Sequence, residues 1–404
     1  MLKARNRVEE LMEQMTLSEK IGQLNLVTPG GDTLTGTVTN GDVANKVKSG
    51  AIGGIFGIKS LSAVRAFQDL AMQSPLRIPL MFAEDVIHGH RTIFPVPLGL
   101  SGTWNMDLIE KAAAVSAREA SAEGIDQVYA PMIDVSRDPR WGRIAESPGE
   151  DPFLASEYTR AFVNGLQGKD LGDKRAVMSC LKHFVAYGGA EGGRDYDSVD
   201  VSARRLHDIY MPPFVAGIKA GAGSMMASFN TVNGTPMHAH GDLIHGVLRR
   251  IYAFSGLMVS DYTGVLELVN HRIAAHGAEA ARLGLEAGVE SDMVSELFLT
   301  TLEESVKNGL IDISHIDNAC RHVLEAKEKL GLFDNPYLRM SAKPFAFRPA
   351  HKQLARQTAT EACVLLKNDH SCLPLKQGAK IALIGPLAND RINMNGTWAV
   401  SGNP

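Results

Sequence analysis

Short apolar runs rich in β-branched residues alternate along most of the chain with longer segments of helical period. This alternation is typical of βα units, in which a helix returns the chain so that successive strands pair in parallel. The expected strands cover 52–58, 79–85, 127–135, 177–184, 224–229, 256–262 and 285–293. The expected helices between them cover 61–73, 106–122, 154–166, 203–220, 242–251 and 274–284.

Polar side chains stand at the ends of several expected strands. Asp85 ends one, Lys182 and His183 end another, and Asp261 ends a third. The strand count is one short of eight, so an open doubly wound sheet also fits the pattern. Convergence of polar groups from the carboxyl ends of many strands favours a (β/α)8 TIM-like barrel.

A second domain is expected to begin near the end of the chain. A helix over 316–330, with Ser314 and Asp317 as a capping pair, should close the barrel. A proline-containing stretch without a clean period follows, and then a strand-like run at 380–385 suggests the beginning of an α/β sandwich. The expected domains are the barrel at 1–332, a linker at 333–377 and the start of an incomplete sandwich domain at 378–404.

Charge and composition exclude several classes of ligand. The formal net charge is −4 and the basic residues are scattered. The sequence therefore has no cluster of positive charge that would indicate binding to nucleic acid or to an anionic membrane. No window approaches the about 20 apolar residues of a bilayer span, and 1–24 is a charged amphipathic segment rather than an export leader. The four cysteines have neither metal-ligand nor disulfide spacing. We expect a small, near-neutral substrate and no cofactor.

Asp261 and Asp85 each follow an apolar strand that stops abruptly. A carboxylate held there by a rigid strand can be a nucleophile, a metal ligand or a helix cap. Glu84, His88 and His90 lie beside Asp85 and could be metal ligands, but no spaced histidine and carboxylate motif supports this. We therefore expect no metal ion.

Lys182 and His183 are adjacent polar groups at the end of a buried strand, and they must find polar partners. They should face a polar pocket, although Lys182 alone also fits the Schiff-base lysine of an aldolase. In segment 138–143, Arg143 could donate paired hydrogen bonds to vicinal oxygens. The polar, glycine-rich loop 187–201 is expected to form a rim or lid over the barrel mouth.

Taken in order, these motifs resemble glycoside hydrolase family 3, close to its bacterial periplasmic β-glucosidase branch. The resemblance spans nearly the whole chain. The whole set of motifs in this order is specific to the family, whereas any single motif is weak evidence for it. The segments that carry it are 82–89, 138–143 with 149–151, 182–184, 230–234, 260–261, 319–333, 362–368 and 373–375.

The resemblance implies a barrel followed by an α/β sandwich, and retaining, exo-acting release of terminal β-D-glucose. It also implies a periplasmic or secreted location. It makes Asp261 the nucleophile and places Tyr262 next to the leaving group. The residues that it implies around the bound sugar are Asp85, Arg143, Lys182 and His183, with Ser228 and Phe229 beside them. The family often has Tyr at position 229 and Trp or His at position 262.

A retaining enzyme needs a second carboxyl group about 5 to 5.5 Å from the first. In the resembling branch that group comes from the second domain, beyond the last residue given, so the isolated chain is expected to be impaired. Glu191, in the loop over the mouth, is the nearest spare candidate. The family's branch that uses a His-Asp pair in this loop does not fit, because 187–201 contains no histidine. A non-catalytic carbohydrate-binding or assembly fragment is the alternative.

Overall fold

The computed structural model describes residues 7–31, 37–58, 60–341, 346 and 348–402. Residues 1–6, 32–36 and 59 of the expected barrel domain, 342–345 and 347 of the expected linker, and 403–404 lie outside the described residues. In the described part, the sheet strands are β1 (Asn25–Val27), β2 (Gly54–Phe56), β3 (Met81–Glu84), β4 (Gln127–Val128), β5 (Met178–Phe184), β6 (Ser224–Ala227), β9 (Leu257–Val259) and β10 (Asp292–Met293). A separate hairpin pairs β7 (Thr231–Val232) with β8 (Thr235–Pro236).

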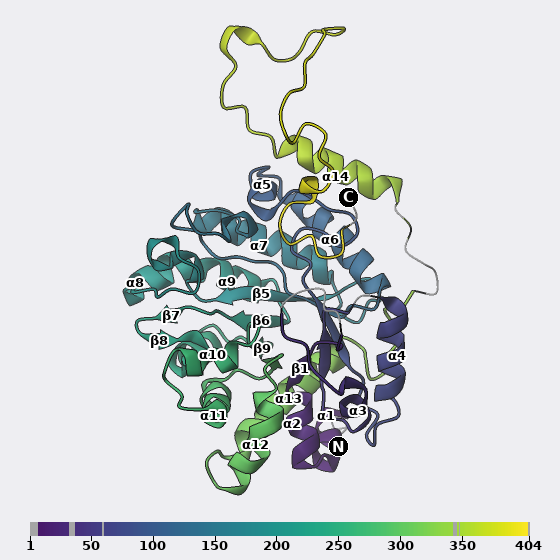
Figure 1. Cartoon of the computed structure of the whole chain (residues 1–404), viewed down its shortest axis with the longest axis vertical. Coiled ribbons are helices and arrows are strands. Elements are labelled where there is room, and N and C mark those ends of the chain that lie inside the picture. The colour runs from purple at the N-terminus through teal and green to yellow at the C-terminus, as the bar shows by residue number, and fades with distance from the viewer. Residues whose placement is uncertain (1–6, 32–36, 59, 342–345, 347, 403–404) are drawn as a thin grey trace, which may run out of the picture.

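The main sheet is a ring of parallel strands with helices around it (Figure 1). Its order is β10-β1-β2-β3-β4-β5-β6-β9, and all neighbours run parallel. A further parallel bridge between Val259 and Ser291 joins β9 to the residue before β10, which closes the ring. The expected (β/α)8 TIM-like barrel is therefore confirmed.

Helices follow the strands as βα units require. Those around the barrel are α1 (Arg7–Gln14), α2 (Leu17–Gln23), α3 (Val43–Lys48), α4 (Leu61–Ala71), α5 (Pro97–Ser101), α6 (Met106–Ala122), α7 (Pro152–Gln167), α8 (Ala203–Arg205), α9 (Met211–Lys219), η6 (Asp242–Ile251), α10 (Gly264–Asn270), α11 (Gly277–Ala287), α12 (Leu297–Lys307) and α13 (Ile313–Lys329). Local signals set several of their ends. The Asp151 side chain accepts a hydrogen bond from Leu154 N–H at 2.7 Å and so caps α7, with Pro152 at its first position.

Three expectations for elements of the barrel were wrong. The uncounted strand is β1, which has only three residues and directly follows the amphipathic helix α2, so it carries no separate pattern. The expected strand 285–293 begins too early, because α11 continues to Ala287 and ends at Gly288, whose φ of 101° suits a glycine cap. The start of α13 is capped by Asp312, which accepts from Ser314 N–H at 2.8 Å, and not by Ser314.

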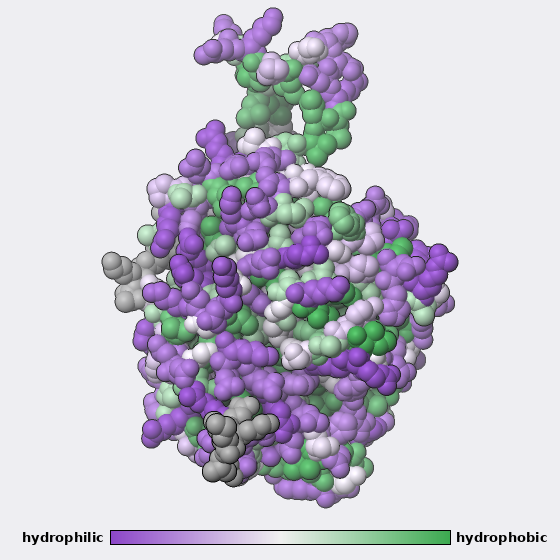
Figure 2. All heavy atoms as spheres, turned by 180° about the vertical axis from the view of Figure 1, so that it is seen from behind, coloured by the Kyte–Doolittle hydropathy of each residue, from purple (hydrophilic) through white to green (hydrophobic). Residues whose placement is uncertain are grey.

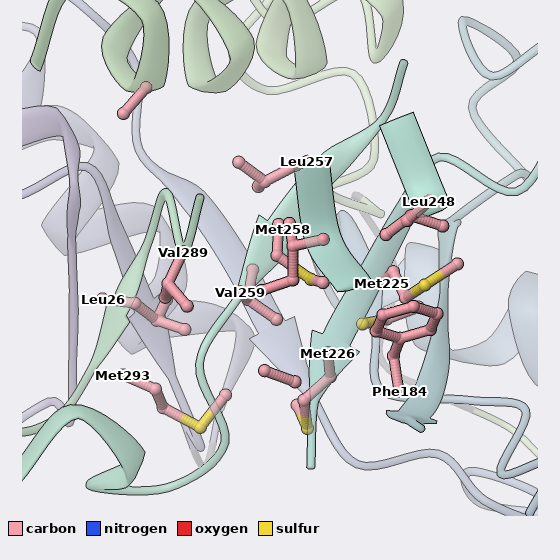
Figure 3. Packing of buried hydrophobic residues seen from close by; sticks show 14 of the residues in the cluster. Leu26, Phe184, Met225, Met226, Leu248, Leu257, Met258, Val259, Val289 and Met293 are labelled. Carbon is pink, nitrogen blue, oxygen red and sulfur yellow. The ribbon is translucent and has the colours of Figure 1, made fainter. Parts of the chain in front are cut away.

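The barrel interior is filled by side chains from adjacent strands. Figure 3 shows Leu26 of β1 beside Met293 of β10, and Val259 of β9 between Leu26 and Met226 of β6. All four side chains are at most 2% exposed. Because these strands are buried on both faces, they are continuous apolar runs, which made most of them recognisable. No helix among the described residues is long and apolar enough to cross a membrane.

Beyond α13, residues 331–341 still pack against the barrel, where Arg339 is 3% exposed and its Nε donates to the Ala176 carbonyl oxygen at 2.8 Å. Helix α14 (Pro349–Glu361) packs beside α6, where His351 Nδ1 lies 2.7 Å from Glu119 Oε1. Residues 363–392, here called the arm, then project from the body (Figure 1), and apolar side chains gather on the arm in Figure 2. The expected strand at 380–385 is absent. Ile381, Leu383 and Ile384 are 65%, 77% and 88% exposed, because a lone strand has no neighbour with which to pair.

The contact between α6 and α7 depends on Gly165. A Cβ added there would lie 2.3 Å from the Glu110 carbonyl oxygen and 2.7 Å from the Ala113 Cβ. Gly165→Ala should therefore force the helices apart and destabilise the barrel by about 1 to 3 kcal/mol. The matched control is Gly246→Ala in η6, where an added Cβ meets nothing closer than 3.5 Å. Thermal unfolding should show a lower midpoint for the first variant only, and equal midpoints would contradict the packing argument.

Candidate active site

A cavity of about 400 Å³ opens at the carboxyl ends of the strands. The charged side chains that line it are Asp85, Arg143, Lys182, Asp261 and Glu267, which come from or follow four different strands. The side chains of Tyr262 and Phe229 also line it. The barrel thus brings together most of the residues singled out in the sequence.

Asp261 follows β9 and is held rigidly by its neighbours. Its backbone N–H donates to His238 Nε2 at 3.0 Å, and the Tyr262 N–H donates to Asp261 Oδ1 at 2.7 Å. The other oxygen, Oδ2, is buried and has no hydrogen-bond partner. Asp261 is 8% exposed. One carboxylate oxygen is therefore available to a ligand in the cavity.

Two cations oppose the cost of burying Asp261. Burial raises the pKa of Asp261 to about 6, while the positive charges of Arg143 and Lys182 act to lower it. Desolvation penalises the charged form, and nearby opposite charges restore part of its stability. The carboxylate is consequently ionised above about pH 6 and protonated below it.

The cations themselves are positioned by carboxylates. Lys182 Nζ donates to Asp85 Oδ1 at 2.9 Å, and their side chains are only 4% and 9% exposed. Arg143 donates to both oxygens of Glu146, at 2.8 and 3.0 Å. Because the Lys182 ammonium donates to a carboxylate, the geometry favours a hydrogen-bond donor over the free amine that a Schiff-base mechanism needs.

His183 lies behind Asp261 rather than on the cavity wall. Its Nδ1 is 2.8 Å from Asp134 Oδ2, and its Nε2 is 3.6 Å from Asp261 Oδ2. The His183 backbone N–H also donates to Asp134 Oδ2 at 3.0 Å. Ser228 is likewise fully buried, and its Oγ lies 3.5 Å from the Val185 carbonyl oxygen, outside the cavity lining.

The protonation of the Asp134 and His183 pair fixes what His183 presents to Asp261. Burial raises the pKa of Asp134 to about 8 and lowers the pKa of His183 well below its usual value. Both shifts favour a protonated carboxyl group beside a neutral imidazole. In that state the carboxyl proton points at Nδ1 and the ring N–H is on Nε2, which lies 3.6 Å from Asp261 Oδ2.

Loop 187–201 forms part of the rim, as expected. Tyr196 lines the cavity and stacks on Phe229 with a ring-centroid distance of 4.7 Å. The loop is anchored by the Trp141 Nε1–H, which donates to Asp195 Oδ1 at 3.0 Å. Glu191 is exposed and does not line the cavity.

The residues weighed as metal ligands have other partners. His88 has a carbonyl oxygen at each ring nitrogen, Phe94 O at 2.7 Å and Thr397 O at 2.6 Å. His90 Nε2 lies 2.9 Å from Glu123 Oε2. Across the part of the chain that the structure describes, no three His, Cys, Asp or Glu side chains are grouped to hold a metal ion.

Sequence reasoning missed several residues of this site. Asp134 ends the expected strand 127–135, so the rule that found Asp85 and Asp261 would also have found it. Glu267 and Tyr196 carry no motif. Trp398 also lines the cavity, although it lies beyond α14 and no strand leads into it. Nothing in its local sequence indicates a place at the barrel mouth.

A carboxylate with one unbonded oxygen at the barrel mouth can supply one of the two carboxyl groups that most glycoside hydrolases use. Residues 16–326 match the family described as Glycosyl hydrolase family 3 N terminal domain. The chain belongs to this family.

Similar proteins cover the chain almost end to end. It is 41% identical over 402 residues to the periplasmic beta-glucosidase of Salmonella typhimurium, covering 98% of this chain and 52% of that protein. It is 34% identical to a beta-xylosidase of Formosa agariphila, covering 98% of this chain and 52% of that protein. The beta-glucosidase from Listeria innocua, solved in complex with glucose, is 38% identical with a TM-score of 0.93, covering 99% of this chain and 57% of that one. The chain spans about half the length of the curated relatives it matches.

The effect of Asp134 on the tautomer of His183 can be tested. In Asp134→Asn the amide oxygen can only accept from the ring, so the proton should move from His183 Nε2 to Nδ1. Histidine ¹⁵N NMR reports this directly. His238 is the internal reference, because its Nε2 accepts from Asp261 N–H and should stay unprotonated in both proteins. A His183 ring that keeps its Nε2 proton in the variant would show that Asp134 does not set the tautomer.

Proposed function

We propose that this chain carries the catalytic barrel of a retaining, exo-acting β-glucosidase whose nucleophile is Asp261. The observation that carries the proposal is the free Oδ2 of Asp261, buried at a cavity that also holds two cations. Membership of glycosyl hydrolase family 3 supports it, as do the relatives named beta-glucosidase.

The ligand is a neutral terminal glucosyl unit of a small β-glucoside or oligosaccharide. Such a unit carries many hydroxyls and no charge, so it needs a few strong hydrogen-bonding groups in a shielded pocket. Asp85 accepts hydrogen bonds from hydroxyls, whereas Lys182 and Arg143 donate. His183 contributes indirectly from behind Asp261, because its Nε2 lies 3.6 Å from Asp261 Oδ2. Ser228 supports this wall from behind, and Tyr262 faces the leaving group.

The reaction takes two steps. Asp261 Oδ2 attacks the anomeric carbon as the bond to the leaving oxygen breaks, and the leaving oxygen takes up a proton. Positive charge develops on the sugar ring, and the carboxylate stabilises that charge before forming the glycosyl ester. Water then attacks the anomeric carbon and loses a proton, which releases glucose and restores Asp261.

The proton for the leaving oxygen must come from a second carboxyl group. Among the described residues, the cavity holds two carboxylates besides Asp261: Asp85, which is bound to Lys182, and Glu267. Glu191 lies exposed on the rim loop. We infer that the acid belongs to the second domain, so this chain alone should cleave only substrates whose leaving groups need little protonation.

We propose that the barrel ends near residue 332, that a linker follows, and that residues 378–404 begin the second domain. The exposed apolar side chains of the arm support this, since a larger domain would bury them. We also propose a periplasmic or secreted location, on the likeness to the periplasmic beta-glucosidase.

The same exposed arm favours one alternative, a carbohydrate-binding or assembly fragment without turnover. The two functions differ in one measurement made on the same sample. A binding fragment would show glucose binding in calorimetry but no release of aglycone from an aryl glucoside, whereas the glucosidase shows both.

Covalent labelling tests the nucleophile. Incubation with an activated 2-deoxy-2-fluoro glucoside should add one glycosyl group to the peptide that contains Asp261, because the leaving group departs without an acid. Asp261→Asn should abolish the mass increase, while Glu191→Gln should leave the labelling rate within about twofold. A label on another peptide, or none on any, would refute the assignment of Asp261.

The pH dependence of this labelling follows from the pKa of Asp261. Only the ionised carboxylate attacks, so the labelling rate should rise as pH increases through about 6 and level off above it. Because Lys182 acts to lower this pKa, Lys182→Met should move the midpoint to higher pH. The labelling rates of both proteins should be measured from roughly pH 4 to 8. A midpoint that is unchanged or lower in Lys182→Met would contradict the proposed effect of the Lys182 charge on the pKa of Asp261.

A further inference from the structure

The C-terminal end of the described chain returns from the arm to the barrel mouth, beside α14 (Figure 1). Residues 396–402, here called the strap, lie against the loop that follows β3. The Thr397 carbonyl oxygen is 2.6 Å from His88 Nε2. The Ser401 carbonyl oxygen accepts from Arg91 at 3.1 Å. The strap is therefore bound through its backbone.

Both side chains that hold the strap are themselves fixed. Arg91 donates to the two oxygens of Glu123, each at 2.8 Å. The second ring nitrogen of His88 is 2.7 Å from the Phe94 carbonyl oxygen. Both ring nitrogens of His88 and the Arg91 guanidinium therefore have fixed partners, and the anchor is a rigid one.

The anchored strap places Trp398 in the wall of the cavity. The indole ring centre is 5.9 Å from the Arg143 guanidinium carbon and 5.8 Å from Lys182 Nζ. Both distances lie within the range of cation–π attraction. Trp398 is 36% exposed, so part of its surface is free to meet a ligand.

The barrel topology defines which end of the cavity Trp398 occupies. From β3, the ring reaches β9 through β4, β5 and β6 in one direction and through β2, β1 and β10 in the other. The two strands are therefore diametrically opposite. The strap is bound on the β3 side, beside the Asp85 and Lys182 pair, whereas Tyr262 follows β9.

We propose that Trp398 is a sugar-binding residue that packs against the terminal glucosyl unit, and that the His88 and Arg91 anchor positions it. This inference rests on the proposed function, because it takes the Asp85, Lys182 and Arg143 end as the glucosyl site. An indole ring offers a flat apolar surface to the C–H groups of a sugar, while the hydroxyls at the ring edge reach the cations. Trp398 thus acts on the glucosyl unit and not on the leaving group.

Intrinsic fluorescence and glucose affinity test this role in the 404-residue chain. Glucose should change the tryptophan emission of the wild type and of Trp104→Phe, whose indole is 66% exposed and outside the cavity, but not that of Trp398→Phe. Calorimetry should give a dissociation constant for glucose about tenfold higher in Trp398→Ala. An emission change that persists in Trp398→Phe, or an unchanged affinity in Trp398→Ala, would overturn the proposal.

A second pair of variants tests the strap without altering Trp398. Gly396 has a φ of 70°, and a Cβ there would lie 2.8 Å from Val96 Cγ1, so Gly396→Ala should displace the strap and weaken glucose binding as Trp398→Ala does. Gly378→Ala is the matched control, because Gly378 has a φ of 79° and open space around it. Equal glucose affinity in the two glycine variants would refute the positioning role.

The labelling of Asp261 separates this inference from the proposed function. If Asp261 is labelled but the Trp398 variants bind glucose like the wild type, the role of Trp398 fails and the nucleophile stands. If the wild type neither binds glucose nor takes up the label, the proposed function fails, and the inference fails with it.

Discussion

A carboxylate that is almost completely removed from water is the constraint around which this barrel mouth is organised. Burial alone would keep Asp261 protonated, and the positive charges of Arg143 and Lys182 bring its pKa back to about 6. Each cation in turn has a carboxylate partner, Glu146 or Asp85, so neither approaches Asp261 closely enough to occupy its free oxygen. The result is a buried carboxylate oxygen, Oδ2, that accepts no hydrogen bond, although His183 Nε2 lies 3.6 Å from it.

Further buried residues hold the groups that surround Asp261. Asp134 binds both the ring and the backbone N–H of His183, and His238 accepts the backbone N–H of Asp261. All of these groups are buried: His183 lies in β5, Asp134 and Asp261 lie in the segments that follow β4 and β9, and His238 lies in the turn after β8. A closed ring of short parallel strands is well suited to this, because every strand ends at the same face and holds its last residue rigidly.

Much of this site could be predicted from the sequence because it obeys a local rule. Asp85, Lys182 and Asp261 end apolar runs, and parallel strands bring such ends together. The same rule covers Asp134. Other features lie outside local rules. The three-residue strand β1 depends on neighbouring strands for its existence, and the apolar run at 380–385 does not form a strand because nothing lies beside it.

The arm gives the strap a particular vulnerability. As long as residues 363–392 are intact, the strap is tethered next to its binding site, and its high effective concentration allows a few backbone hydrogen bonds to hold it. In the isolated 404-residue chain the arm is exposed, and exposed chain of this kind is where proteases cut. A single cleavage there would turn the intramolecular contact of the strap into a bimolecular one. The barrel would then stay folded while the fragment that carries Trp398 dissociated from it.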